Sequence, residues 1–191
     1  MRLILATRNL HKVRELGRLV APNQLEPLPD AVTLPPEDGD TFADNALAKA
    51  RAAAVATGRP AIADDSGIVA QALGGAPGVR SARFAGEDAT DEENLARLLR
   101  EAPAGSELAY VCALAFADAG GGVERIFEGR CTGTLAREPR GAGGFGYDPA
   151  FVPDDDATGR TMAELNPAEK DAISHRGRAA RALADWLRER R

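Results

Sequence analysis

Two short apolar runs, each next to a helical pattern, constrain the fold of this chain more than any other feature. The run at residues 2–6 is followed by apolar residues that recur at helical spacing through residues 10–20. The second run, "AIADD" at residues 61–65, follows a helical segment at residues 41–58 with a capping pattern at its start and a glycine at its end. Strands that alternate with helices in this way are typical of an α/β fold.

The later segments add an antiparallel pair to this pattern. Residues 108–118 and 123–136 resemble two strands joined by glycines, which predicts a β-hairpin. A capping box at Thr90 and Glu93 opens a further helix, and the chain ends in helices after Asn166. We therefore expect a mixed sheet with flanking helices in one domain, residues 1–191.

Composition narrows the class of protein. The chain has 191 residues, of which 44% are hydrophobic and 28% charged, and its formal charge is -5. A net negative charge favours neither nucleic acid nor an anionic membrane as partner. No apolar run approaches the roughly 18 residues that span a bilayer, and the N-terminal run is too short for a signal peptide. We expect a cytoplasmic protein whose two cysteines are buried thiols.

The segment "AIADDSG" places two carboxylates at the expected end of a buried strand. Because side chains alternate along a strand, Asp64 and Asp65 should point in different directions. Hard oxygen ligands of this kind suit magnesium, which binds one or two carboxylates plus substrate phosphates, and Glu37 is a candidate second ligand. The structural alternative is an Asx-turn that closes the strand.

The loop "ATRNLHK" joins the first strand to the first helix and is a candidate phosphate site. Backbone N–H groups at a helix N-terminus favour anions, while Thr7, Asn9 and Lys12 add polar or charged groups. The P-loop pattern is absent, so a simple helix cap is the alternative interpretation.

Two later segments could bind a planar ligand. Phe145 and Tyr147 lie in the glycine-rich "GAGGFGYDP" and could stack on a base, although one ring could instead fill the core beneath the loop. In "EKDAISHRG", Lys170, His175 and Arg176 gather positive charge, for which an ordinary charged surface is the alternative.

Taken in order, these segments resemble the non-canonical purine nucleoside triphosphate pyrophosphatases, also called inosine or xanthosine triphosphate pyrophosphatases. The resemblance covers nearly the whole chain and is carried by "ATRNLHKVREL", "DTFADNALAKA", "AIADDSG", "LGGAPGVRSARFAG", "GGFGYDPAFVP" and "TMAELNPAEKDAISHRG". It implies an elongated mixed sheet in two lobes around a central cleft, a homodimer, and Mg²⁺-dependent hydrolysis of dITP, ITP, XTP or dXTP to the monophosphate and pyrophosphate.

The resemblance also implies roles for individual residues. Asp65 would be the catalytic carboxylate and a magnesium ligand, with Glu37 as a possible second ligand. The substrate-binding residues that it implies are Thr7, Asn9, Lys12, Lys49, Ser66, Phe145, Gly146, Tyr147, Asp148, Lys170, His175 and Arg176. Many members have glycine where this chain has Arg8 and His11, so we expect these two side chains to point away from the phosphates.

The products imply a mechanism. Release of pyrophosphate requires attack on the α-phosphorus, and Asp65 would orient or deprotonate the water. A hydrogen-bond donor aimed at the C6 carbonyl of hypoxanthine or xanthine would reject adenine, which has an amino group there. Three alternatives remain: a related pyrophosphatase acting on pyrimidine or modified nucleotides, a nucleotide-binding sensor without catalysis, and, least favoured, a structural or interaction protein.

Overall fold

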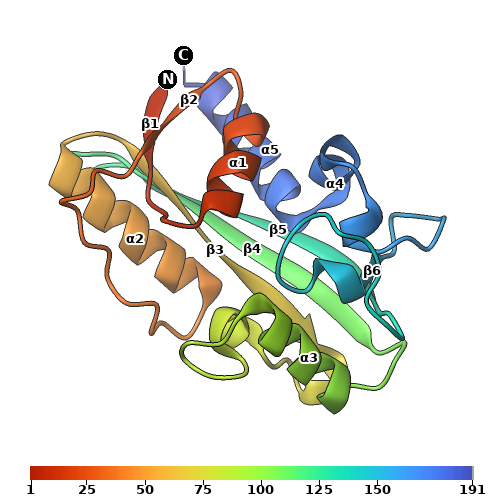
Figure 1. The fold of residues 1–191 in the computed structure, drawn as a ribbon. Helices are drawn as coiled ribbons and strands as arrows, with labels where there is room; N and C mark the ends of the chain where they lie inside the picture. Colours follow the sequence, from red (N-terminus) through yellow and green to blue (C-terminus); the bar gives the residue numbers. More distant parts are fainter. Residues whose placement is uncertain (191) are drawn as a thin grey trace. The chain divides into compact units, whose positions relative to one another are not determined.

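A computed structural model describes residues 1–190, and its strands form one mixed sheet (Figure 1). The strand order is β2-β1-β3-β4-β5-β6. The strands are β1 (Arg2–Leu5), β2 (Gln24–Pro27), β3 (Ala61–Ala70), β4 (Glu107–Ala117), β5 (Glu124–Leu135) and β6 (Phe151–Pro153). β1 pairs in parallel with β2 and β3, whereas β5 and β6 are antiparallel. The predicted α/β class and mixed sheet are thereby confirmed.

The helices lie where the sequence pattern expects them. They are α1 (Leu10–Leu19), α2 (Phe42–Thr57), α3 (Asp91–Glu101), α4 (Pro167–Ile173) and α5 (His175–Arg188), with short 3₁₀ segments at Gln71–Leu73, Gly78–Arg83, Asp148–Ala150 and Met162–Glu164. Among residues 1–190, none of these helices is both long and apolar enough to cross a bilayer.

Side chains at the helix ends explain where the helices begin and end. Thr90 and Glu93 form the predicted capping box of α3, and Asn166 caps α4. At α2 the Thr41 hydroxyl accepts from the Asp44 N–H and donates to the Asp44 carboxylate. Gly58 ends α2 with a φ of 64°, a left-handed conformation that glycine adopts without strain.

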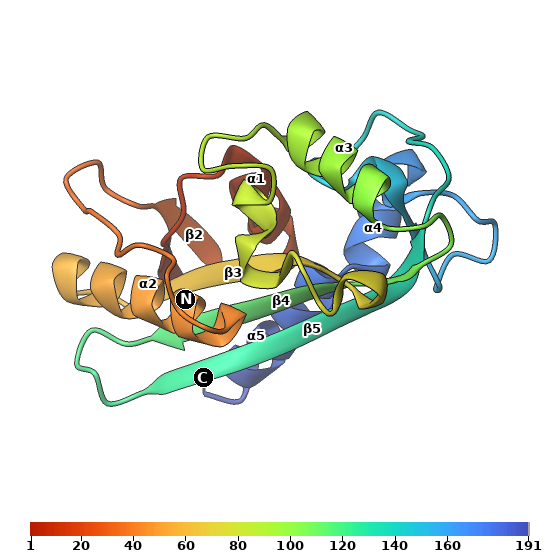
Figure 2. The ribbon, with the colours of Figure 1, turned by 90° about the horizontal axis from the view of Figure 1, so that it is seen from below.

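The chain divides into two compact units, and β3, β4 and β5 contribute to both. Unit 1 contains Met1–Asp65, Cys112–Gly129 and the chain from Arg176 onward, and unit 2 contains Ser66–Val111 and Arg130–His175. Figure 2 shows β3, β4 and β5 side by side. The six residues 118–123 that join β4 to β5 are too few for a parallel crossover, so these neighbouring strands form the predicted hairpin.

In unit 1 the sheet has an apolar cluster on each face. One cluster joins β1, β3 and β4 to α1 and α5 through side chains such as Leu5, Leu16 and Leu183. The other cluster uses the alternate strand positions, including Ile4 and Ala63, and packs them against the alanine-rich face of α2. The small alanine side chains let α2 lie close to the sheet.

In unit 2 a single cluster gathers α3, the 3₁₀ segments and one face of the strands. Its members include Leu98, Tyr110, Phe151 and Met162, and the Tyr110 and Phe151 rings lie 4.7 Å apart. Cys131 belongs to this cluster and Cys112 to unit 1, and both are buried free thiols as expected.

The expected end of the strand at Asp65 is wrong, because β3 continues to Ala70. Gly67 allows this continuation. A Cβ atom at that position would lie 2.3 Å from the Ser81 hydroxyl, which instead accepts a 2.9 Å hydrogen bond from the Ile68 N–H. The glycine therefore serves close packing within a strand, and the two carboxylates lie in the middle of β3.

Candidate active site

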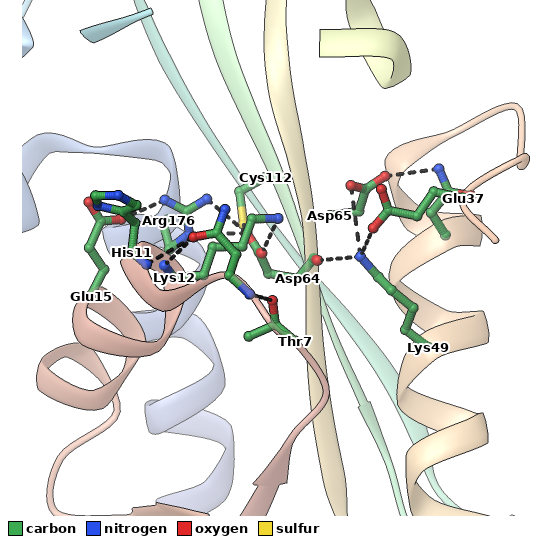
Figure 3. A network of polar contacts seen from close by, with 12 residues as sticks. Thr7, His11, Lys12, Glu15, Glu37, Lys49, Asp64, Asp65, Cys112 and Arg176 are labelled. Atoms are coloured by element: carbon green, nitrogen blue, oxygen red, sulfur yellow. Dashed lines mark hydrogen bonds and ion pairs between the residues drawn. The ribbon is translucent and has the colours of Figure 1, made fainter. Parts of the chain in front are cut away.

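Asp64 and Asp65 leave β3 on opposite faces of the unit 1 sheet (Figure 3). Asp64 lies on the side of α1 and α5, where it contacts Lys12 and Arg176. Asp65 lies on the side of α2, where it accepts a 2.9 Å hydrogen bond from the Asn45 amide. The alternation of the strand thus separates the two carboxylates, as the sequence predicts, and an Asx-turn at the end of a strand is excluded.

Asp64 is completely buried but surrounded by cations. The Lys12 ammonium lies 2.6 Å from Oδ1, the Arg176 guanidinium lies 3.0 Å from Oδ2, and the Cys112 thiol lies 3.6 Å from Oδ2. Burial alone would raise the pKa of Asp64, but the charges of Arg176, Lys12 and Lys49 outweigh it and hold that pKa well below its usual value. Asp64 is therefore an ionised carboxylate that fixes Lys12.

Among residues 1–190, Arg176 has the largest fully buried side chain, and Glu15 is a second partner of its guanidinium. Arg176 Nη1 donates to Glu15 Oε2 at 2.5 Å, within unit 1. Sequence reasoning missed both Glu15 and this role of Arg176. The two residues are 161 positions apart, and Glu15 lies in a helix where an exposed acidic residue would be ordinary.

On the other face of the sheet, Lys49 links two carboxylates. Its ammonium contacts Glu37, lies 3.9 Å from Asp65 Oδ1, and donates a 2.8 Å hydrogen bond to the Asp64 carbonyl. Burial raises the pKa of Asp65 and the nearby Glu37 adds to this effect, whereas Lys49 and Asn45 oppose it. The sequence did not indicate Asn45, which resembles any polar residue in the first turn of a helix.

The donor set fits a hard divalent cation. Glu37 and Asp65 supply carboxylate oxygens, and a dication would relieve the repulsion by which Glu37 raises the Asp65 pKa. Among residues 1–190, no three His, Cys, Asp or Glu side chains are arranged to hold a metal ion by themselves. Magnesium commonly takes its remaining ligands from water and substrate phosphates, so two carboxylates are sufficient.

The loop between β1 and α1 is ordered by its own side chains. Asn9 caps α1 by accepting from the His11 and Lys12 N–H groups at 2.9 and 3.2 Å, and its own N–H donates to the Thr7 hydroxyl at 3.2 Å. The cap interpretation is therefore correct for Asn9. The helix N-terminus that it organises still has the geometry that favours anions, and the position of Lys12 in the first turn adds positive charge.

In unit 2 the glycine-rich loop is held by two carboxylates. Asp148 Oδ2 accepts from the Phe145 N–H at 2.9 Å and from the Lys170 ammonium at 2.7 Å, and Lys170 lies 5.1 Å from the centre of the Phe145 ring. Asp91, at the start of α3, accepts from the Gly146 N–H at 2.9 Å. These contacts bring Phe145, Asp148 and Lys170 together.

The other predicted substrate-binding residues of unit 2 occupy either core or half-buried positions. The Tyr147 ring belongs to the apolar cluster, and its hydroxyl donates to the Ser81 carbonyl at 2.7 Å, so this ring fills the core beneath the loop. Phe145 and Ser66 are half-buried. His175 is buried, and its ring stacks on Tyr110 with centroids 4.5 Å apart.

Lysine usage gives a compositional signal that agrees with this geometry. The chain has 24 Lys and Arg residues, yet the printed sequence contains only three lysines: Lys12, Lys49 and Lys170. Each of the three lies within 4 Å of a buried carboxylate. In a chain that otherwise uses arginine for its positive charges, all three lysines therefore lie at buried carboxylates of the candidate site.

The fold and these clusters define a class: α/β proteins with carboxylate–lysine pairs beside a strand-to-helix loop suited to phosphate. Within that class the chain belongs to the Ham1 family, whose model matches residues 3–186. A dITP/XTP pyrophosphatase of Frankia alni is 51% identical over 202 residues, covering 99% of this chain and 98% of the relative. A dITP/XTP pyrophosphatase of Streptomyces coelicolor is 48% identical, covering 98% of each chain.

Solved structures agree with the family assignment. A HAM1 protein from Coxiella burnetii superposes with a TM-score of 0.88 at 40% identity and covers 99% of each chain. A nucleoside-triphosphatase, or dITP/XTP pyrophosphatase, from Mycobacterium abscessus gives a TM-score of 0.73 at 44% identity, covering 96% of this chain and 98% of that one. The family resemblance carried by the sequence motifs is confirmed.

Proposed function

We propose that this protein hydrolyses non-canonical purine nucleoside triphosphates, dITP, ITP, XTP and dXTP, to the monophosphate and pyrophosphate and so cleanses the nucleotide pool. The observation that carries the proposal is the buried Asp64–Asp65 pair, each carboxylate held by a lysine on its own face of the sheet. Relatives that share about half of its residues over nearly the full length are dITP/XTP pyrophosphatases, which supports the same activity here.

The triphosphate is bound by the unit 1 cations. Lys12 lies in the first turn of α1 beside Asn9 and Thr7, where a helix N-terminus and an ammonium group both favour phosphate oxygens. Lys49 provides a second positive charge next to Asp65. Both ammonium groups are fixed by carboxylates before substrate arrives, so little ordering cost remains at binding.

Asp65 acts on the water. Its raised pKa makes it a better proton acceptor than an ordinary aspartate, and the Asn45 amide fixes the orientation of its carboxylate. The carboxylate takes a proton from water as the oxygen attacks the α-phosphorus, and pyrophosphate leaves. Asp65 and Glu37 would hold magnesium, which would supply charge neutralisation on the phosphate oxygens.

The purine base is bound by unit 2. Phe145 offers a half-buried ring beside Lys170. We assign Ser66, Gly146, Tyr147, Asp148, Lys170 and His175 to the same base site. A donor that faces the C6 carbonyl accepts hypoxanthine and xanthine and leaves the adenine amino group unpaired. Guanine shares that carbonyl and must be rejected at its 2-amino group. Arg176 contacts Asp64 and Glu15. That it also binds the base stays a prediction.

A turnover assay with Mg²⁺ and ITP, dITP, XTP, ATP, GTP and dTTP tests the proposal, with products resolved by chromatography. IMP or XMP with pyrophosphate, and little product from ATP or GTP, is the expected result. Release of orthophosphate would contradict attack at the α-phosphorus, and a preference for dTTP would indicate a pyrimidine-directed enzyme. Nucleotide binding without turnover would indicate a sensor. We also expect a homodimer, which sedimentation of the same sample measures.

A further inference from the structure

The Arg8 guanidinium donates hydrogen bonds to residues 28–32, which form a loop further along the chain. It donates to the Leu28 carbonyl at 2.9 Å, to the Pro29 carbonyl at 2.8 Å and to the Val32 carbonyl at 3.2 Å. It also contacts the backbone carbonyl and the carboxylate of Asp30, at 3.4 and 3.3 Å. One side chain thus contacts four backbone carbonyls within residues 28–32.

The loop that Arg8 holds is the one that supplies Glu37. It runs from the end of β2 to the start of α2, residues 28–41, and contains no helix or strand. Its far end is fixed by α2, because the Gly39 N–H donates to the Asn45 side chain at 2.8 Å and Lys49 contacts Glu37. Loops of this length without secondary structure are usually functional or mobile, so anchors at both ends matter.

We propose that Arg8 is a positioning residue that couples the phosphate loop to Glu37. Arg8 lies between Thr7 and Asn9, so the chain segment that meets the phosphates also holds the start of the Glu37 loop. The contacts of Arg8 keep Glu37 beside Lys49 and Asp65. The effect on catalysis rests on the proposed function, whereas the effect on the loop does not.

Arginine suits this task better than lysine. Its planar group carries five N–H donors in a fixed fork, which can satisfy several carbonyls at once, whereas an ammonium is a compact point charge on a flexible stem. The ion pair with Asp30 contributes little, because the Arg8 and Asp30 side chains are 50% and fully exposed. The carbonyl contacts therefore carry the effect.

Hydrogen exchange without nucleotide tests the coupling directly. In Arg8→Ala, the peptide covering residues 28–40 should exchange roughly tenfold faster under millisecond labelling, because charged hydrogen bonds to its carbonyls are lost. Arg8→Lys should give an intermediate rate. Arg14→Ala removes an exposed arginine from the neighbouring helix, and Asp30→Asn removes only the ion pair, so both should exchange like the wild type. Unchanged exchange in Arg8→Ala would overturn the proposal.

Kinetics of the same variants test the link to Glu37. Arg8→Ala should require several-fold more Mg²⁺ for half-maximal turnover, with less than about a twofold change in KM for ITP at saturating Mg²⁺. A large rise in that KM with normal exchange would instead make Arg8 a phosphate ligand and overturn the proposal. Unaltered Mg²⁺ dependence with faster exchange would also overturn the link to Glu37. Should the wild type release no pyrophosphate, the proposed function fails and the exchange rates still decide the coupling.

Discussion

Asn45 Nδ2 donates a 2.9 Å hydrogen bond to Asp65 Oδ2, while Asn45 Oδ1 accepts from the Gly39 N–H at 2.8 Å. A single buried amide therefore connects the Asp65 carboxylate to the loop that carries Glu37. Gly39 makes the contact possible, because a Cβ there would lie 2.7 Å from the Asn45 oxygen. Asn45 is the residue through which the position of Asp65 can be changed without altering the carboxylate itself.

Asn45→Ala should lower kcat for ITP by about tenfold or more, because Asp65 loses a hydrogen bond to its charged form. Asn45→Asp, which is nearly isosteric, should lower it further because two carboxylates would then face each other. Pyrophosphate release at saturating Mg²⁺ measures both. Asp38→Asn changes an exposed residue of the neighbouring loop and is the control. Equal activity in all three variants would remove Asn45 from the site.

The acid limb of the pH–rate profile should report Asp65. A general base is active when deprotonated, so turnover falls as the pH drops through its pKa, which burial and Glu37 raise above the usual value. In the metal-free protein, where no dication offsets it, Glu37→Gln removes the like charge and should move the titration of Asp65, followed by carbon NMR, to lower pH. Asn45→Ala should move it to higher pH. Shifts in the same direction in both variants would contradict this assignment.

Asp65→Asn should abolish turnover and leave ITP binding largely intact, because the amide keeps the shape but cannot accept the proton. Isothermal titration with ITP and Mg²⁺ measures binding, and pyrophosphate release measures turnover. Asp38→Asn again provides the matched control. Retained activity in Asp65→Asn would exclude Asp65 as the base.

Removing Arg176 should be costly for folding. Arg176→Met leaves Asp64 and Glu15 buried without their shared cation, which typically costs about 3–5 kcal/mol of unfolding free energy. Urea unfolding measures the loss. Arg181→Met alters an exposed arginine of the same helix and should stay within about 0.5 kcal/mol of wild type. A loss of less than about 1 kcal/mol in Arg176→Met would show that the network contributes little.

The Asp64 network should also make stability depend on pH. The folded-state pKa of Asp64 lies below its unfolded value, so its contribution is present above roughly pH 4, the unfolded pKa, and is lost as the pH falls below that value. Urea unfolding of the wild type between neutral and acid pH measures this slope. Asp64→Asn should show a shallower slope, and an identical slope would assign the acid sensitivity to other carboxylates.

Local sequence signals were sufficient for most of the fold. Caps at Thr90 and Asn166 and the glycine after α2 fix helix ends through contacts within a few residues, so they can be read directly from the sequence. The opposite directions of Asp64 and Asp65 follow from strand geometry alone. The length of β3 did not follow, because Gly67 is explained by Ser81, which packs against it from another segment.

The residues of the candidate site that the sequence did not indicate are those whose partners lie far away along the chain. Glu15 meets Arg176 across 161 positions, and Asn45 meets Asp65 across 20, and no local pattern distinguishes either residue from an ordinary polar one. Lysine count is a global signal that agrees with part of the candidate site, because Lys12, Lys49 and Lys170 are the only lysines of the sequence and each contacts a buried carboxylate.

The third lysine gives the test of base selection. Lys170 pairs with Asp148 at 2.7 Å beside the Phe145 ring, so its charge and the loop geometry are coupled. Lys170→Met should lower the ratio of kcat/KM for ITP to that for ATP by about tenfold or more, because a donor near the base is lost. Lys170→Arg keeps the charge and should retain more of the ratio. Lys170 could read the base or support the loop, and Asp148→Asn distinguishes these two roles, since it disturbs the loop and retains the Lys170 ammonium. If Lys170→Met raises KM equally for ITP and ATP, and Asp148→Asn does the same, then Lys170 supports the loop and another group reads the base.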